Sequence, residues 1–128
     1  MATWPQSFPK DCPPAESQEP EGRVYRLVSA NPPGKKDFLS YHELDPVKWE
    51  GNCRACGLSV FRDISDAKRL LRRVRAMEKM KEFEFIASGS LEKSDGKLMY
   101  TPPVQQNSHH TWWIPLGWNR HNAFSVVE

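Results

Sequence analysis

The sequence predicts an α+β fold: a single domain with a mixed or antiparallel sheet and one main amphipathic helix. The chain has 128 residues, 38% of them hydrophobic, so a second core would leave each half too small to bury enough surface. Several short segments are rich in β-branched and aromatic residues and are separated by Pro, Gly and Asn. Only one segment follows a clear helical period. Many strands with a single helix favour an α+β sheet protein.

The first 22 residues differ from the rest of the chain. They hold five of its 11 prolines, with Ser, Glu and Gln between them, and this composition supplies no repeating apolar face. We expect a Pro-rich extended arm over residues 1–22 and the single α+β domain over residues 23–128. Trp4 and Phe8 of the arm could dock on the domain or stay in solvent, and the sequence leaves both open.

The first predicted strand covers residues 24–28, where Val, Tyr and Leu are frequent. It stops at residues 31–34, where two prolines remove backbone donors and a glycine permits a turn. A short apolar run follows at residues 37–41, and then a polar loop to Gly51. Residues 58–61 form the next predicted strand.

The most regular segment is a predicted helix at residues 65–76. Asp63 can cap its N-terminus, and apolar residues recur every three or four positions. These apolar residues are Ala67, Leu70, Leu71, Val74 and Met77. The other faces carry cations that could contact nucleic-acid phosphates, although a solvated charged surface is the commoner interpretation. The cations are Lys68, Arg69, Arg72, Arg73 and Arg75.

Four further segments complete the predicted sheet. Residues 83–87 alternate as a strand, and Asp95 and Gly96 offer a tight turn before residues 97–101. We expect these two runs to form a hairpin. Residues 109–114 and 123–127 are the last predicted strands.

The charge balance and the apolar runs limit the class of protein. The formal net charge is +2, from 18 Lys and Arg against 16 Asp and Glu, which excludes an overall cationic field that binds nucleic acids indiscriminately. No apolar run reaches the length that spans a bilayer, about 20 residues. The first residues lack the pattern of a signal peptide. We therefore expect a cytoplasmic protein without a membrane partner.

The three cysteines are too few for a disulfide framework, so reduced thiols are expected. Cys53 and Cys56 have the spacing of a zinc-binding pair, and a histidine or Cys12 could complete a tetrahedral site. No second pair with metal spacing accompanies them. Two ordinary thiols are therefore the preferred interpretation, and no metal site is predicted.

Two places carry candidate functional side chains. Arg26 alternates with two valines, so on an inward face its guanidinium needs an anion or carbonyl oxygens as partners, and on an outward face its head lies in water. Residues 108–113 place a histidine and a tryptophan on each face of a strand. Imidazole titrates near neutral pH and indole stacks on flat rings, so this segment suits an aromatic ligand, with a packed core strand as the alternative.

The order of these features resembles the ADP-ribosyltransferase fold, including poly(ADP-ribose) polymerases and bacterial toxins. Arg26 matches an NAD-contacting Arg or His on the first strand, and Ser40 or Tyr41 could match a hydroxyl-bearing residue on a later strand. Residues 57–61 resemble a Gly-x-x-x-aromatic stretch that leads into a helix, and residues 85–89 resemble an Ala-x-Gly segment. The chain also looks like short uncharacterised bacterial and phage proteins.

The resemblance implies a nucleotide-binding protein, toxin or defence related, that uses NAD to modify a protein or nucleotide acceptor. Arg26 would hold the diphosphate, Ser40 or Tyr41 would line the ribose, and His110 would orient or deprotonate the acceptor. Trp112 or Trp113 would stack on a ring. The glutamate that the family places late in the fold has no counterpart beside the histidines. Either a histidine replaces it or the site only binds.

Two other classes stay open. A non-catalytic inhibitor or immunity protein, phage or plasmid encoded, would bind a host protein through the Trp-rich end and the Pro-rich arm. A small RNA-binding or metal-dependent nuclease module would use the basic helix together with the His and Cys residues.

Overall fold

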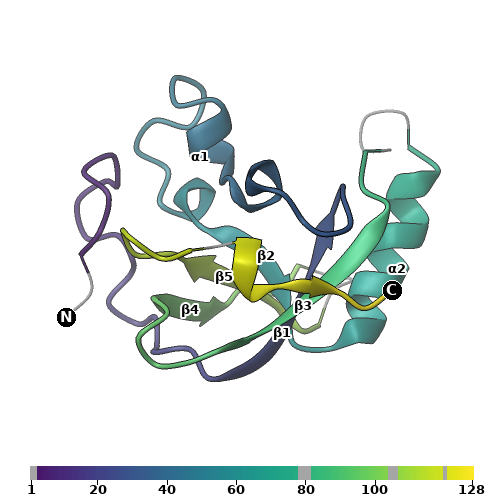
Figure 1. Ribbon diagram of the computed structural model, residues 1–128. Coiled ribbons are helices and arrows are strands. Elements are labelled where there is room, and N and C mark those ends of the chain that lie inside the picture. The colour runs from purple at the N-terminus through teal and green to yellow at the C-terminus, as the bar shows by residue number, and fades with distance from the viewer. Residues whose placement is uncertain (1–2, 78–81, 104–106, 120) are drawn as a thin grey trace.

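Six strands form one sheet in the computed structural model, which describes residues 3–77, 82–103, 107–119 and 121–128 (Figure 1). The strand order is β4-β5-β2-β1-β3-β6, and all neighbours run antiparallel. The strands are β1 (Gly22–Val28), β2 (Leu58–Phe61), β3 (Phe85–Leu91), β4 (Lys97–Tyr100), β5 (His109–Trp113) and β6 (Ser125–Val126). With one main helix, this confirms the predicted α+β class, and the sheet is the antiparallel alternative.

Among the described residues, two α-helices and several short 3-10 turns connect the strands. The α-helices are α1 (Tyr41–Leu44) and α2 (Ile64–Arg75), and the turns include η1 (Lys35–Phe38), η2 (Arg54–Cys56) and η4 (His121–Ala123). The apolar run at 37–41 therefore forms parts of η1 and α1. Figure 1 shows α2 lying along the sheet and α1 standing beyond one end of it.

The prediction of α2 is confirmed within one residue at each end. The Asp63 carboxylate accepts a hydrogen bond from the Ser65 N–H at 2.8 Å and so caps the first turn. The buried stripe of α2 packs on one face of the sheet and forms a core there. That core consists of Leu27, Phe61, Ala67, Leu71, Val74 and Ile86.

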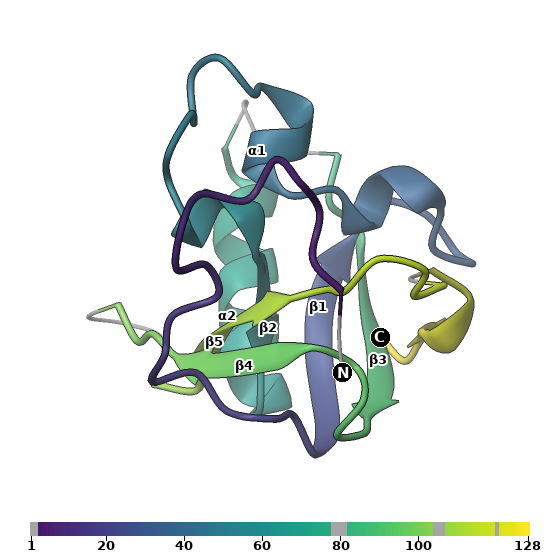
Figure 2. The same cartoon turned by 90° about the vertical axis from the view of Figure 1, so that its left-hand side faces the viewer.

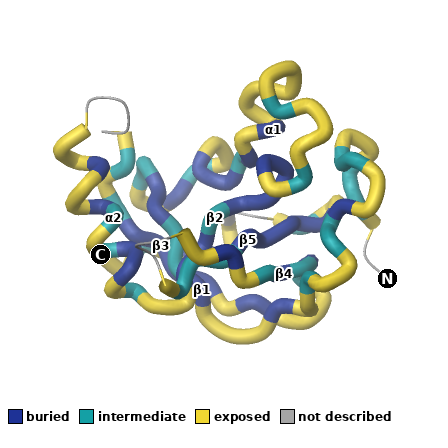
Figure 3. Tube along the Cα trace, turned by 180° about the vertical axis from the view of Figure 1, so that it is seen from behind, coloured by how far each residue is buried: buried dark blue, intermediate teal, exposed yellow. Residues whose placement is uncertain are grey.

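The opposite face of the sheet carries a second, larger core, covered by loops instead of a helix. Its members come from β1, β2, β3, β4 and β5 and from the segments around η1 and η4. They include Val24, Val28, Phe38, Leu58, Val60, Trp112 and Phe124. Figure 3 shows buried residues concentrated in the strands and exposed residues in the loops around α1.

The predicted hairpin between 83–87 and 97–101 is wrong. β3 pairs with β1 and β6, whereas β4 pairs with β5 at the other edge of the sheet. Asp95 and Gly96 do lie in the turn that leads into β4, and Gly96 has a φ of +108°. The turn signal was therefore right locally, but a turn does not decide which strands pair.

The N-terminal arm lies on the domain (Figure 2). Trp4 and Phe8 stack with their ring centroids 5.9 Å apart and pack against a small buried cluster of Cys12, Cys56 and Trp113. Farther along, Gln18 exchanges two backbone hydrogen bonds with Leu98 of β4, at 2.8 and 2.7 Å. The arm thus adds a short bridge to the edge of the sheet.

Cys12 of the arm forms a disulfide with Cys53, which overturns the expectation of reduced thiols for these two residues. Their Cα atoms lie 5.6 Å apart although 41 positions separate them, so only the folded chain reveals the pairing. Cys56 is free and buried. Within the described residues, no helix combines the length and the apolar character that crossing a membrane requires.

Candidate functional site

The candidate site lies where β1 and β2 separate. β1 pairs with β3 along all seven of its residues, but it pairs with β2 only at Tyr25 and Phe61. In an antiparallel ladder continued from that pair, Leu27 would oppose Ser59. The ladder instead opens at this end of the two strands.

Arg26 bridges the opening. Its Nη1 donates to the Ser59 carbonyl at 2.7 Å, and its Nε donates to the Asp37 carbonyl at 2.9 Å. The guanidinium also lies over the Phe38 ring, 5.8 Å from the centroid. Of the alternatives open for Arg26, the structure therefore shows an inward guanidinium whose partners include carbonyl oxygens.

A cleft of about 370 Å³ occupies the opening, a volume within the range of small-molecule sites. Its lining includes residues of the cores on both faces of the sheet, Leu58 of the larger core and Leu27 and Phe61 of the core beneath α2. Its apolar wall is formed by Leu27, Leu39, Leu44, Leu58, Phe61, Leu70 and Phe83. Its polar groups come from Arg26, Ser29, Lys36, Asp37, Ser40, Tyr41, Ser59 and Glu82.

Hydrogen bonds of two side chains shape the outer wall of the cleft. The buried Asp37 carboxylate accepts from the Ser29 N–H and hydroxyl at 2.8 and 2.7 Å, and from the Gly34 N–H at 3.1 Å. Ser40 caps α1 by accepting from the Glu43 N–H at 3.1 Å, and the Glu43 carboxylate accepts from the Ser40 N–H in return. Ser40 therefore lines the cleft from a helix cap and not from a strand.

Ser59 connects the cleft to a histidine. The Ser59 Oγ lies 3.0 Å from Nε2 of His109 on the neighbouring strand β5. On the other side of the ring, Nδ1 lies 2.8 Å from the Thr101 carbonyl oxygen and 2.9 Å from the Thr101 hydroxyl. A carbonyl oxygen only accepts, so Nδ1 carries the proton in the neutral ring. Nε2 then accepts the hydrogen bond from the Ser59 hydroxyl.

Burial favours this neutral state. It is the main cause that lowers the pKa of the His109 imidazole below its ordinary value. The bond to the Thr101 carbonyl opposes the shift, whereas nearby positive charges add to it. Those charges belong to His110, Arg54 and Arg26.

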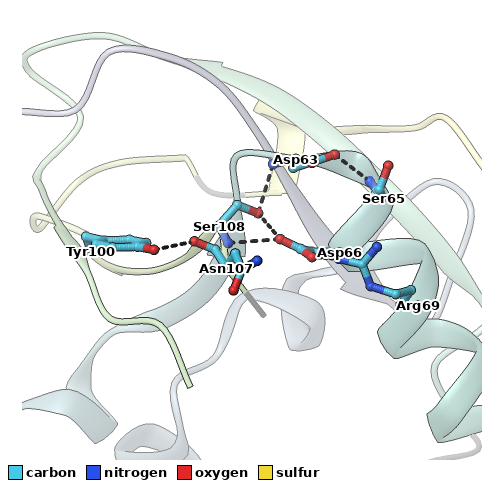
Figure 4. Close-up of polar contacts among 7 residues, drawn as sticks. All are labelled: Asp63, Ser65, Asp66, Arg69, Tyr100, Asn107 and Ser108. Atoms are coloured by element: carbon cyan, nitrogen blue, oxygen red, sulfur yellow. Dashed lines mark hydrogen bonds and ion pairs between the residues drawn. The ribbon is translucent and has the colours of Figure 1, made fainter. Parts of the chain in front are cut away.

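A hydrogen-bond network at the start of α2 holds the beginning of β5 in place (Figure 4). The nearly fully buried Asp66 carboxylate accepts from the Ser108 N–H at 2.9 Å and from its hydroxyl at 2.5 Å. Arg69 pairs with the same carboxylate. The Ser108 hydroxyl in turn accepts from the Asp63 N–H at 3.0 Å. Ser108 directly precedes His109, so the network positions the histidine.

His110 does not share the cleft with Arg26, Ser40 and Tyr41. It lies on the opposite face of β5 from His109 and lines a separate hollow of about 260 Å³ together with Arg62, Tyr100 and residues of the arm. Its Nδ1 lies 2.8 Å from the Ser108 carbonyl oxygen. Burial lowers its pKa, with Arg62 adding to the shift and the Ser108 bond opposing it. The expected meeting of Arg26, Tyr41 and His110 in one cleft is therefore wrong.

Trp112 and Trp113 are core residues. Both are fully buried, and their indole N–H groups donate to the carbonyls of Asp95 and Cys53 at 2.7 and 2.8 Å. Neither ring face is open to a ligand, which leaves the stacking role expected for them without structural support. The two large side chains fill space in the core, which is sufficient to explain their position.

The other chemical candidates are engaged elsewhere. Cys53 forms a disulfide with Cys12, so it is not available to bind a metal together with Cys56. No group of three or more His, Cys, Asp or Glu in a metal-binding arrangement occurs among the described residues. On α2, Lys68 pairs with Glu128 at 2.7 Å, Arg69 with Asp66, and Arg75 donates to the Glu84 carbonyl.

Ser59 and His109 are the functional candidates that sequence reasoning missed. Ser59 lies in the Gly-x-x-x-aromatic stretch, which drew attention for its pattern and not for its hydroxyl. Alternation along the strand puts His109 and His110 on opposite faces but does not show which of them faces a site. A strand-pairing register would have done so, because it places His109 opposite Phe61, on the same face as Ser59.

Comparisons of the chain with protein-family models, with curated proteins and with solved structures found no match.

Proposed function

We propose that the cleft between β1 and β2 binds NAD or a related nucleotide, and that the protein is an ADP-ribosyltransferase-like enzyme. One observation carries the proposal. Three segments that carry the resemblance lie far apart in sequence, and each contributes residues to the lining of the same cleft. They are Arg26, the pair Ser40 and Tyr41, and the stretch 57–61.

The residue roles differ from those that the sequence suggested. The volume of about 370 Å³ suits one nucleoside half of NAD better than the whole dinucleotide. Tyr41 is 57% exposed, and one face of its ring stacks on Trp49 with the centroids 5.6 Å apart, so a ligand ring would stack on its other face. The exposed Lys36 and the half-buried Arg26 both line the cleft and would supply positive charge for the diphosphate.

Ser59 would supply the strand hydroxyl in place of Ser40 or Tyr41, and His109 would supply the imidazole in place of His110. The Ser59 hydroxyl belongs to a strand, as the resemblance requires, and it contacts His109. For an acid that orients the ribose, the described cleft residues offer Glu82 at the rim, because hydrogen bonds already occupy the Asp37 carboxylate. His109 or Glu82 would then assist the acceptor.

Calorimetric titration with NAD, and separately with its two nucleoside halves, tests the binding step. We expect Tyr41→Ala to weaken binding about 3- to 10-fold, the size of a lost ring contact. Tyr100→Ala is a matched control, since Tyr100 is also 57% exposed but lines the other hollow. Equal weakening by both variants, or no binding by the intact protein, would overturn the proposal.

Incubation with labelled NAD and a cell lysate tests the transfer step. Label should move to an acceptor with the intact protein, and Glu82→Gln or His109→Gln should reduce the transfer. Retained NAD binding without any transfer would reduce the function to binding alone.

A second candidate function is recognition of a host protein without catalysis. One surface observation favours it: Tyr41, Leu44 and Val47 are 57%, 61% and 86% exposed within one short segment. This segment, and not the buried tryptophans, offers the apolar contact area. Leu44→Asp should abolish capture of such a partner, whereas Leu116→Asp, at a residue 57% exposed elsewhere, should not.

A further inference from the structure

We propose that Ser59 and His109 form a nucleophile–base pair that opens into the cleft and hydrolyses carboxylic esters with apolar acyl groups. This inference does not rest on a nucleotide ligand. It starts from three groups that two hydrogen bonds connect: the Thr101 carbonyl, the His109 ring and the Ser59 hydroxyl.

The distances match the contact between a serine nucleophile and its base. The hydroxyl lies 3.0 Å from Nε2, within hydrogen-bond reach of its base. The Thr101 carbonyl, 2.8 Å from Nδ1, fixes the tautomer in which Nε2 can take a proton. A main-chain carbonyl thus has the orienting role that a carboxylate has in many triads.

The surroundings of Ser59 match an apolar acyl group. Ser59 is half-buried and belongs to the cleft wall, on the same face of β2 as Phe61. Leu27, Phe61 and Leu70 line the cleft from that side, and all belong to or pack on the core beneath α2. The cleft could therefore bury an apolar acyl chain away from water while the ester carbonyl lies next to the Ser59 hydroxyl.

The reaction balances with water as the only co-reactant. The Ser59 Oγ attacks the ester carbonyl carbon and its proton passes to Nε2 of His109. The imidazolium returns that proton to the leaving alcohol as the C–O bond breaks, which leaves an acyl group on Ser59. Water then attacks this acyl group, gives a proton to Nε2, and the acid leaves as Ser59 regains the proton.

An alkyl fluorophosphonate tests the pair directly. Attack by Ser59 forms an O–P bond and breaks the P–F bond, with release of fluoride and transfer of the serine proton to His109. Mass spectrometry of the intact protein should show one label for each chain, and peptide mapping should place it on Ser59. Ser59→Ala should abolish the label and also the hydrolysis of 4-nitrophenyl butyrate.

Control variants, one for the histidine and one for the serine, separate this role from a structural one. His109→Gln should slow labelling at least 100-fold, the lower range for loss of a general base, whereas His110→Gln should leave the labelling rate unchanged. Ser90→Ala, at an exposed serine of β3, is the control for Ser59. Circular dichroism checks each fold, and if His109→Gln does not fold, Ser59→Ala alone decides.

Labelling elsewhere, or no labelling of the folded protein, would overturn the pair. NAD binding would stand in that case, because the calorimetric test needs no nucleophile. Conversely, labelling of Ser59 in a protein that does not bind NAD would support the pair and remove the nucleotide proposal.

Discussion

The two edges of β1 are held by different kinds of contact. Along β3, the backbone ladder covers all seven residues, and buried side chains pack on both faces. Along β2, one register pair remains, and the bonds from Arg26 to the Ser59 and Asp37 carbonyls hold the strands and loops together. The paired edge gives the fold its stability, and the open edge provides the cleft.

Shortening a side chain on the paired edge should have the largest effect. Ile86 is fully buried opposite Leu27, so Ile86→Ala should lower the free energy of unfolding by about 2–5 kcal/mol. Leu44→Ala on the exposed side of the cleft should change it by less than about 0.5 kcal/mol. Urea unfolding measures both values, and similar losses would contradict the division of roles between the edges.

Removal of the disulfide should cause the next largest loss of stability, because this bond links the arm to the loop that leads into β2. Cys12→Ser should cost about 2–4 kcal/mol, as expected for a closed loop of this length. Hydrogen exchange should then quicken in β2 and β5 more than in β3. Cys56→Ala, at the free cysteine, is the control, and uniform quickening across the sheet would argue against a local role.

Arg26→Met should cost about 2–3 kcal/mol, because two carbonyl oxygens lose a charged donor. Arg23→Met is the matched substitution on the same strand. Arg23 is exposed and donates to the Ser88 hydroxyl at 2.8 Å, so its loss should cost less than about 1 kcal/mol. Chemical denaturation compares them, and an equal cost would show that Arg26 does not hold the opening together.

The pH dependence of stability should be the smallest effect. The pKa values of His109 and His110 are lowered in the folded protein, so below about pH 6.5 the unfolded chain binds more protons than the folded one. Stability should therefore fall as the pH drops from 7 toward the folded pKa values. His109→Gln should flatten part of this slope, and an unchanged slope would place the titration elsewhere.

The sequence predicted those parts of the fold that depend on local patterns. The period of Ala67, Leu71 and Val74 predicted α2, and strand-forming residues predicted segments that overlap all six strands. These local patterns did not predict which strands pair, since the turn at Asp95 and Gly96 is compatible with any partner for β4. Nothing in a single sequence encodes such a choice locally.

The site could be predicted only in part for the same reason. Arg26, Ser40 and Tyr41 do line one cleft. The opening between β1 and β2 arises from the register of both strands, so neither Ser59 nor His109 could be singled out from spacing. Trp112 and Trp113 were misassigned because a buried indole and a ligand-binding indole look alike in sequence.

The tautomers of the two adjacent histidines, measured by long-range ¹⁵N–¹H NMR at pH 7, test most directly whether the open edge holds a reactive pair. His109 should be neutral, with the proton on Nδ1, and its Nε2 resonance should shift in Ser59→Ala while the His110 resonances stay in place. A charged His109, or a neutral one with the proton on Nε2, would contradict the pairing of Ser59 with its base.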